Sequence, residues 1–304
     1  MIVYRELSSL EKDLGVSSKA LYALTNRMHK HYRKVKIPKG NGEFRTLYVP
    51  DDFLKTVQRK IAENLLSYEE ISMYATAYRL GGNTLKNAVP HVGKPVVMKL
   101  DIRQFFDHCI YPIVKDKAFP KERYSEKNRV LLTLLCIYKD ALPQGAPTSP
   151  PISNIILRDF DNAIGEWCKT RGITYTRYCD DMTFSGDFDS REVKLFVKSE
   201  LKKLGFFLNN SKTVVLHDGQ RKSVTGIVVN EKPNISAEYR RELRKALYYC
   251  KKFGIDEHLM KTGNSTPKEL YIKKLLGRVN YVLSVRSGDK EFLRYRDWLL
   301  TLVS

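Results

Sequence analysis

Three aspartates have the side chains and the setting to form one metal-binding site. Asp180 and Asp181 are adjacent in Tyr178-Cys179-Asp180-Asp181, and Asp101 ends the apolar run at 95–100. The segments on either side of the pair, 173–177 and 182–185, are rich in β-branched and aromatic residues, which predicts a hairpin with both acids at its turn. An ordinary hairpin is the alternative interpretation, because Asp is common at turns.

Carboxylates in this pattern could hold two divalent cations, since Mg²⁺ prefers hard oxygen ligands. Such a site suits nucleotidyl transfer from a nucleoside triphosphate, in which one ion lowers the pKa of the attacking hydroxyl and the other stabilises the pyrophosphate leaving group. Without metal, the three like charges repel, so at least one carboxylate pKa should be raised and metal binding should release protons.

The elements around the aspartates alternate in a defined order. A strand ends at Asp101, a helix runs from about Pro151 to Cys168, the hairpin follows, and a helix at 191–204 precedes a short strand at 213–216. This β-α-β-β-α-β order predicts a ferredoxin-like antiparallel sheet within an α+β fold. That sheet places its first strand beside the central hairpin, so Asp101 should lie next to Asp180 and Asp181.

Two further elements carry positive charge. Strands at 35–38 and 43–49, joined by a Gly-rich turn that contains Lys39, predict a hairpin with a basic tip. A helix should begin after Ser236 and stop at Gly254. Its two cationic flanks, which are equally consistent with an ordinary solvated face, are Arg240, Arg244 and Lys251, and Arg241, Lys245 and Lys252.

The composition favours a polyanionic partner. The 304 residues are 42% hydrophobic, and 53 Lys plus Arg against 34 Asp plus Glu give a formal net charge of +19. Nucleic acid is therefore the first candidate. No stretch is long enough to span a bilayer and no signal segment follows Met1, so we expect a soluble, cytoplasmic protein. The five scattered cysteines predict reduced thiols rather than disulfides or a zinc site.

Three segments together resemble successive reverse transcriptase motifs. They are Leu100-Asp101 through Asp107, Leu142-Pro143-Gln144-Gly145 through Pro150, and Tyr178-Cys179-Asp180-Asp181. The segments 44–50 and 205–212 resemble the fingers hairpin and a later palm motif of that family. Asn87-Ala88-Val89-Pro90-His91 and Val224-Thr225-Gly226 resemble the NAxxH and VTG motifs of bacterial retron reverse transcriptases. Cys179 departs from the pattern, because retron enzymes commonly carry Ala there, and we expect altered packing with little loss of activity.

The resemblance implies a role for each matching residue. Asp101, Asp180 and Asp181 would hold two Mg²⁺ ions, and the Phe106 ring would exclude a ribonucleotide 2′-OH by a steric clash. The remaining assignments are Gln144 and Gly145 in the nucleotide pocket, Lys39 and Arg45 on the triphosphate, Lys212 near the departing pyrophosphate, Tyr178, Cys179 and the strand Val224-Thr225-Gly226 near the primer, and Asn87 and His91 on the RNA. An ordinary core aromatic at 106 and a surface lysine at 212 are the alternatives.

The resemblance also implies a right-hand polymerase. N-terminal helices and fingers would occupy 1–94, a palm with the triad 95–230, and a helical thumb 231–304, whose basic helix would follow a duplex backbone. The implied activity is RNA-directed DNA synthesis from dNTPs. A cognate structured noncoding RNA would serve as template and primer. DNA synthesis would start from a 2′-OH of this RNA, and the product would be RNA linked to DNA. RNase H would come from another protein, and an unnamed effector would act with the enzyme in phage defence.

Two alternatives remain. Another bacterial reverse transcriptase, of the group II intron or diversity-generating type, would lack the NAxxH and VTG segments, and the chain ends at Ser304 without room for an endonuclease domain. A non-catalytic RNA- or DNA-binding module could use 14–21 as a helix-turn-helix. That reading leaves the three aspartates and the Pro-Gln-Gly loop unexplained.

Overall fold

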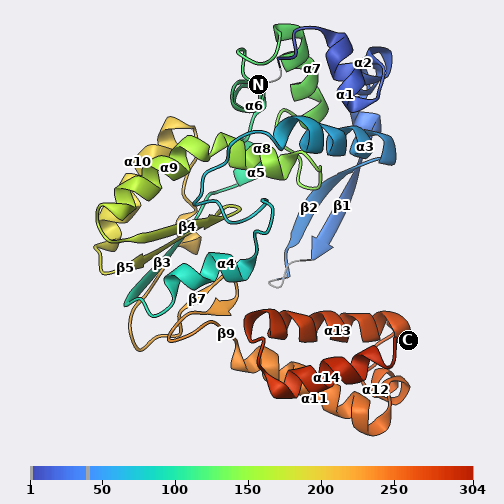
Figure 1. The fold of residues 1–304 in the computed structure, drawn as a ribbon, viewed down its shortest axis with the longest axis vertical. Helices are drawn as coiled ribbons and strands as arrows, with labels where there is room; N and C mark the ends of the chain where they lie inside the picture. The colour runs from blue at the N-terminus through green and yellow to red at the C-terminus, as the bar shows by residue number, and fades with distance from the viewer. Residues whose placement is uncertain (1–2, 39–41, 304) are drawn as a thin grey trace. The chain divides into compact units, whose positions relative to one another are not determined.

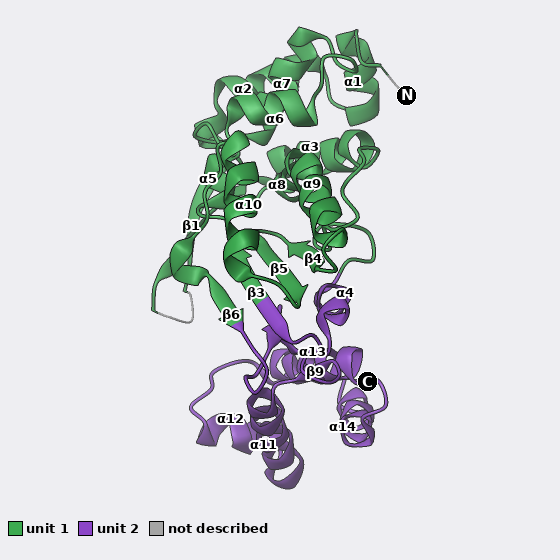
Figure 2. Ribbon diagram, turned by 90° about the vertical axis from the view of Figure 1, so that its left-hand side faces the viewer, with its two compact units in different colours: residues 1–82, 98–215 green, residues 83–97, 216–304 purple. Residues whose placement is uncertain are grey.

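A computed structural model describes residues 3–38 and 42–303 of the chain. These residues form two compact units, each with its own hydrophobic core (Figure 2). Unit 1 comprises residues 1–82 and 98–215, and unit 2 comprises residues 83–97 and 216–304. Each unit is therefore built from two segments that are distant in sequence.

The sheet that carries the aspartates has four strands in the order β4-β5-β3-β6. β4 and β5 pair antiparallel, with Tyr178 opposite Asp181, so Cys179 and Asp180 form a two-residue turn. This is the predicted ferredoxin-like order, with the first strand beside the hairpin. The bounds are β3 Val96–Asp101, β4 Thr174–Tyr178, β5 Asp181–Gly186 and β6 Val214–Leu216.

Helices α9 (Arg158–Lys169) and α10 (Ser190–Lys203) lie on one side of this sheet (Figure 1). They bury apolar side chains such as Ile164 and Val197 against the strands, which explains their amphipathic pattern. The helix predicted at 151–168 is two helices, α8 (Ser149–Ile156) and α9. They are separated by Leu157, whose backbone leaves the helical region at φ −89° and ψ 3°.

The fingers-like hairpin is also present in unit 1. β1 (Tyr32–Pro38) and β2 (Phe44–Pro50) pair antiparallel over their full length. Residue Lys39, predicted to contact the triphosphate, lies outside the described residues. The other elements of this unit are α1 Leu7–Leu14, α2 Ser18–Asn26, η1 Met28–Lys30, α3 Asp52–Ile61, η2 Ala62–Leu66, α5 Phe105–His108, α6 Tyr111–Ala118, α7 Glu126–Cys136 and η4 Asn210–Lys212.

Helices α1 and α2 are joined by a short turn within 14–21, the segment that was considered as a helix-turn-helix. Gly15 ends α1 with φ 58°, and the Ser17 side chain caps α2 by accepting from the backbone N–H of Ala20. Leu14 and Leu21 are fully buried in the core of unit 1. The pair is therefore packed into the same unit as the sheet that carries the aspartates.

Unit 2 combines a small sheet with a helical bundle. The predicted helix is α11 (Ala237–Phe253), which Ser236 caps by accepting from the Tyr239 N–H, and which ends at Gly254. No described helix is both long and apolar enough to cross a membrane. The remaining elements are α4 Thr84–Ala88, η3 Val89–His91, β7 Ser223–Val224, β8 Ile227–Val228, β9 Asn234–Ile235, α12 Ile255–Lys261, α13 Lys268–Val285 and α14 Lys290–Leu300.

Candidate active site

The three predicted aspartates meet at one edge of the unit 1 sheet. Asp101 ends β3, and Asp180 and Asp181 lie at the β4–β5 turn, so that one carboxylate oxygen from each lies within 4.8 Å of the others. The Ile102 N–H donates to the Asp180 carbonyl at 3.1 Å, which ties the end of β3 to the turn. Asp101 is buried, Asp180 half-buried and Asp181 the most exposed. Three converging hard-oxygen donors fit a divalent cation.

The electrostatics of this cluster agree with the predicted repulsion. Burial, followed by the charge of Asp101, raises the pKa of Asp180. Loss of hydration, followed by the charges of Asp180 and Asp101, raises the pKa of Asp181 to about 6. The expectation that at least one carboxylate pKa is raised is therefore confirmed.

Lys212 contacts the cluster directly. Its Nζ lies 2.7 Å from Oδ2 of Asp101, and this hydrogen bond raises the pKa of the lysine. The backbone places it there, because the Asn209 N–H donates to the Asp101 carbonyl at 2.8 Å and η4 follows at once. The side chain is 59% exposed, so it can also reach a ligand that enters from solvent.

A pocket of about 600 Å³ opens beside the aspartates. Cationic, aromatic and amide side chains from separate elements line it together with the acids. The predicted site residues among its lining are Arg45, Asp101, Phe106, Gln144, Cys179, Asp180 and Lys212. The hairpin, the Pro-Gln-Gly loop and the sheet edge therefore all contribute side chains to one cavity.

Gly145 borders a neighbouring pocket of about 370 Å³ together with Arg45, Phe106 and Gln144. Its φ is +122°, and a Cβ here would lie 2.9 Å from the Tyr48 carbonyl oxygen, so only glycine fits without a shift of β2. The Tyr48 N–H also donates to the Gln144 carbonyl at 2.9 Å. This loop is thus joined to the hairpin through backbone contacts.

Tyr78 lines both pockets and was not among the predicted site residues. It follows a segment without helical or strand periodicity, and its backbone is left-handed, with φ 57°. Burial, followed by the neighbouring Cys179 thiol, raises the pKa of Tyr78. A tyrosine within an aperiodic segment carries no pattern that could have identified it.

Residues 37–229 match the family model described as reverse transcriptase (RNA-dependent DNA polymerase). The retron Ec86 reverse transcriptase of Escherichia coli is 31% identical over 267 residues, which cover 84% of this chain and 82% of that relative. The chain belongs to the retron reverse transcriptases. The retron Ec83 reverse transcriptase of Escherichia coli is 33% identical over 247 residues, 75% of this chain and 78% of that one.

Membership makes this retron reverse transcriptase an RNA-directed DNA polymerase and implies use of a divalent metal. The predicted right-hand polymerase fold, with its ferredoxin-like palm sheet, is confirmed. Among solved structures, apo telomerase from Candida tropicalis aligns with 94% of this chain and 63% of that chain, at a TM-score of 0.45 and 12% identity.

In the retron enzyme, the two family-specific segments lie together in unit 2. The Asn87 side chain donates to Thr225 Oγ1 at 3.4 Å, and Thr225 Oγ1 donates to the Thr84 carbonyl at 3.1 Å. Asn87 and His91 are 1% and 0% exposed, so in this conformation they pack inside the unit. Their predicted contact with RNA stays a prediction.

The VTG segment corrects one expectation about local structure. Val224 ends β7, but Thr225 and Gly226 are the turn of the β7–β8 hairpin rather than a continuing strand. Both turn residues have positive φ, 46° and 83°, which matches the backbone twist of a tight hairpin and which the glycine accepts readily. The turn conformation, rather than a strand, is what this segment specifies.

The cations predicted on the thumb helix differ in their surroundings. Arg244 forms a bidentate ion pair with Glu291 of α14, at 2.6 and 2.7 Å, so a phosphate would compete with that carboxylate. Arg240 is half-buried. The exposed cations of this helix are Arg241, Lys245, Lys251 and Lys252. Within residues 3–38 and 42–303, none of these four forms an ion pair with a carboxylate.

Proposed function

We propose that this retron reverse transcriptase copies part of a cognate structured noncoding RNA into single-stranded DNA by two-metal nucleotidyl transfer. The observation that carries the proposal is the convergence of three carboxylates within 4.8 Å beside a pocket that also presents Arg45, Phe106 and Lys212. When bound, two Mg²⁺ ions would lower the pKa of the primer hydroxyl and offset the charge that develops on the phosphates.

The protein's own side chains would orient the nucleotide. Arg45 extends from β2 into the pocket and would hold the triphosphate by charge-assisted hydrogen bonds. Gln144 would contact the base or sugar, and the Phe106 ring would occupy the space of a 2′-OH. Lys212, already protonated beside Asp101, can donate a proton or neutralise charge at the departing pyrophosphate.

We assign the polymerase subdomains to three consecutive parts of the chain. Residues 1–94 would form the N-terminal helices and fingers, 95–230 the palm and 231–304 the thumb. The exposed cations of α11 would follow the phosphates of a duplex, with Tyr178, Cys179 and the VTG turn near the primer end. Asn87 and His91 would contact the RNA only after a local rearrangement that exposes their buried side chains.

Retron membership supports the finer parts of the proposal. Priming would use a 2′-OH of the cognate RNA, RNase H would act in trans, and an effector protein would join the enzyme in phage defence. Recognition of one RNA would rest on its folded shape and unstacked bases, because phosphate contacts carry little sequence information.

The test is to purify the tagged protein from cells that carry its own genomic locus and to sequence the bound nucleic acid before and after debranching. We expect an RNA joined through an internal 2′-OH to single-stranded DNA. The Asp180→Asn, Asp181→Asn variant should retain the RNA and carry no DNA. Recovery of linear complementary DNA alone would contradict 2′ priming, and DNA on the double variant would contradict the metal site.

A further inference from the structure

A buried ion pair lies next to the turn that carries the catalytic aspartates. Arg177 of β4 and Asp161 of α9 are both 0% exposed, with Nε 2.8 Å from Oδ1 and Nη2 2.5 Å from Oδ2. Tyr175 also donates to Asp161 Oδ1 at 2.8 Å. Burying two charges costs desolvation energy, and apolar residues often stabilise such a position equally well. Stability alone therefore does not account for the pair.

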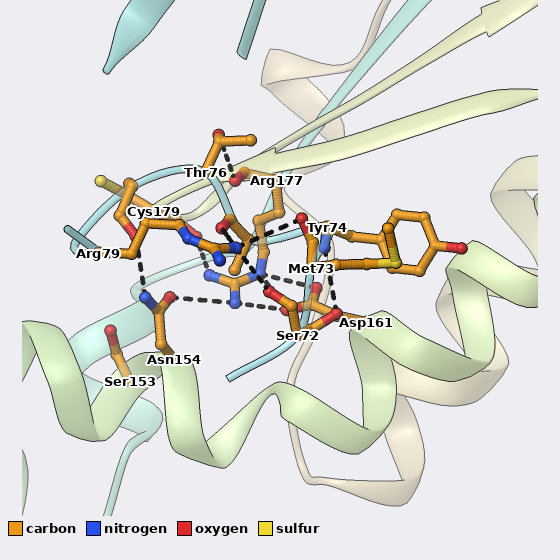
Figure 3. A network of polar contacts seen from close by, with 12 residues as sticks. Ser72, Met73, Tyr74, Thr76, Arg79, Ser153, Asn154, Asp161, Arg177 and Cys179 are labelled. Carbon is orange, nitrogen blue, oxygen red and sulfur yellow. Dashed lines mark hydrogen bonds and ion pairs between the residues drawn. The ribbon is translucent and has the colours of Figure 1, made fainter. Parts of the chain in front are cut away.

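The remaining guanidinium donors of Arg177 point toward two other segments (Figure 3). Nη1 donates to the Cys179 carbonyl at 2.8 Å, and Nη2 donates to Asn154 Oδ1 at 3.2 Å. The Asn154 amide in turn donates to the Ala77 carbonyl at 2.9 Å. One side chain is thus connected both to the aspartate turn and to the residue that precedes Tyr78.

Backbone contacts tie the same two segments together. The Arg177 N–H donates to the Tyr74 carbonyl, and the Thr76 N–H donates to the Arg177 carbonyl, each at 2.8 Å. Segment 74–76 therefore runs along β4. Tyr78, two residues after this segment, lines the same pocket as Cys179 and Asp180.

Tyr78 and Cys179 both have left-handed backbones, at φ 57° and 60°. Residues other than Gly, Asn and Asp rarely adopt this backbone conformation. Where they do, several surrounding contacts usually hold the backbone in place. Here one chain of hydrogen bonds holds both segments: Arg177 donates to the Cys179 carbonyl and to the Asn154 side chain, and Asn154 donates to the carbonyl of Ala77, the residue before Tyr78.

We propose that Arg177, held by Asp161 and linked to Asn154, is a positioning residue for the active site. It fixes the Cys179 carbonyl, and with it the peptide that orients Asp180, and it holds Tyr78 as a wall of the nucleotide pocket. The planar guanidinium supplies these donors in one rigid fork, which a lysine ammonium cannot reproduce. The inference rests on the proposed metal-binding role of Asp180.

The first test separates positioning from stability. In the double variant Arg177→Met, Asp161→Leu, an apolar pair replaces the charges, which should preserve folding. The affinity of the protein for Mn²⁺ is measured without nucleic acid, from the electron paramagnetic resonance signal of the free ion. We expect this affinity to fall about 10- to 100-fold, as is typical when outer-shell partners are lost. A matched control is Arg123→Met, Glu69→Leu, a second ion pair of low exposure in unit 1, which should bind Mn²⁺ as the wild type does.

Arg177→Lys decides the case if the double variant does not fold, because it keeps a charge beside Asp161 and loses the donor to Cys179. It should also weaken Mn²⁺ binding by about tenfold. Wild-type Mn²⁺ affinity in a folded variant at position 177 would overturn the proposal. If Asp180→Asn also binds Mn²⁺ as tightly as the wild type, the proposed metal site fails instead, so the two failures can be told apart.

The link through Asn154 is tested by Asn154→Leu, which keeps the ion pair. We expect the dNTP KM in primer extension to rise about three- to tenfold, as for loss of one buried hydrogen bond, with a smaller change in kcat. An unchanged KM in the folded variant would overturn the part of the proposal that concerns Tyr78.

Discussion

Phe106 is the residue that we propose determines which sugar this polymerase accepts. It lies on the short helix α5, half-buried, with its ring 5.3 Å from that of Phe105, and it lines the pocket that Asp101 and Asp180 border. A rigid ring at the sugar position would reject the additional 2′ oxygen by a clash rather than by a lost contact.

Replacing Phe106 with Val should therefore admit ribonucleotides. We expect the ratio of kcat/KM for dCTP to that for CTP to fall at least about tenfold, because opening a pocket by a few carbon atoms changes discrimination by this order. Steady-state primer extension with each nucleotide measures the ratio. Phe207→Val is the control, since Phe207 is 54% exposed and does not line the pocket; an unchanged ratio in Phe106→Val would make the ring an ordinary core residue.

The sequence predicted the acids and not the residues that position them, for a physical reason. Asp180 and Asp181 are adjacent, and strand order alone brings Asp101 to them. Arg177, Asn154 and Ala77 instead meet through packing across 23 and 77 positions of the chain. No local periodicity encodes such contacts, so they became visible only in three dimensions.

Between elements, a backbone hydrogen bond of 2.9 Å joins β2 to the Pro-Gln-Gly loop, from the Tyr48 N–H to the Gln144 carbonyl. It depends on Gly145, because a Cβ there would approach the Tyr48 carbonyl to 2.9 Å. The contact aligns Arg45 on the hairpin with Gln144 on the loop, and both line the two pockets.

Gly145→Ala should destabilise the protein by about 1–3 kcal/mol, from backbone strain plus displacement of β2, and should raise the dNTP KM. Chemical denaturation and primer extension measure the two effects. Gly172→Ala is a matched control, because Gly172 also has positive φ, +68°, but its Cβ would meet nothing within 4 Å. Equal effects of the two substitutions would mean that the collision with Tyr48 is unimportant.

The packing of η3 in unit 2 makes stability depend on pH. Burial, followed by the charge of Lys94, lowers the pKa of His91 to about 4 from an ordinary value of 6.5. The folded state therefore keeps His91 neutral where the unfolded state takes up a proton. The resulting loss of stability is absent above pH 6.5 and grows as the pH falls toward 4.

At pH 5 this linkage should cost about 2 kcal/mol relative to pH 7. We expect the drop in unfolding free energy from pH 7 to pH 5 to be smaller by about that amount in His91→Leu than in the wild type, as measured by denaturant titration at both values. Identical pH dependence in the two proteins would show that His91 titrates normally in the fold.

Regular elements could be predicted where periodicity and caps agreed, as for α11 between Ser236 and Gly254. The prediction was wrong where a turn looked like a strand, at Thr225 and Gly226, because positive φ at a threonine leaves no trace in composition. It also merged α8 and α9, since the break at Leu157 keeps the apolar spacing in register.

Over the whole molecule, the excess of cationic residues favours binding to a polyanion but provides no specificity for a particular nucleotide sequence. The formal charge of +19 includes the exposed cations of α11, whose phosphate contacts would release counterions and so weaken with salt.

Replacing Arg241, Lys245 and Lys252 together with Gln should reduce the slope of log K against log salt concentration by about 2–3 for an RNA–DNA duplex, near 0.9 per lost phosphate contact. Fluorescence anisotropy across a salt series measures the slope. Removing Lys194, Lys198 and Lys202 of α10 takes away the same charge from unit 1 and should leave it nearly unchanged. Equal slopes for both triple variants would attribute binding to net charge alone.

We attribute the catalysis of RNA-directed DNA synthesis to Asp101, Asp180 and Asp181. Single-turnover primer extension on an RNA template with Mg²⁺ and dNTPs measures what each of these carboxylates contributes. The wild type should extend the primer. Asp101→Asn and Asp180→Asn should slow extension at least about a thousandfold, because losing a metal ligand removes several kcal/mol of transition-state stabilisation. Asp107→Asn, in the same pocket, should retain activity. Extension at the wild-type rate by Asp101→Asn or Asp180→Asn would show that these carboxylates are not the catalytic metal ligands.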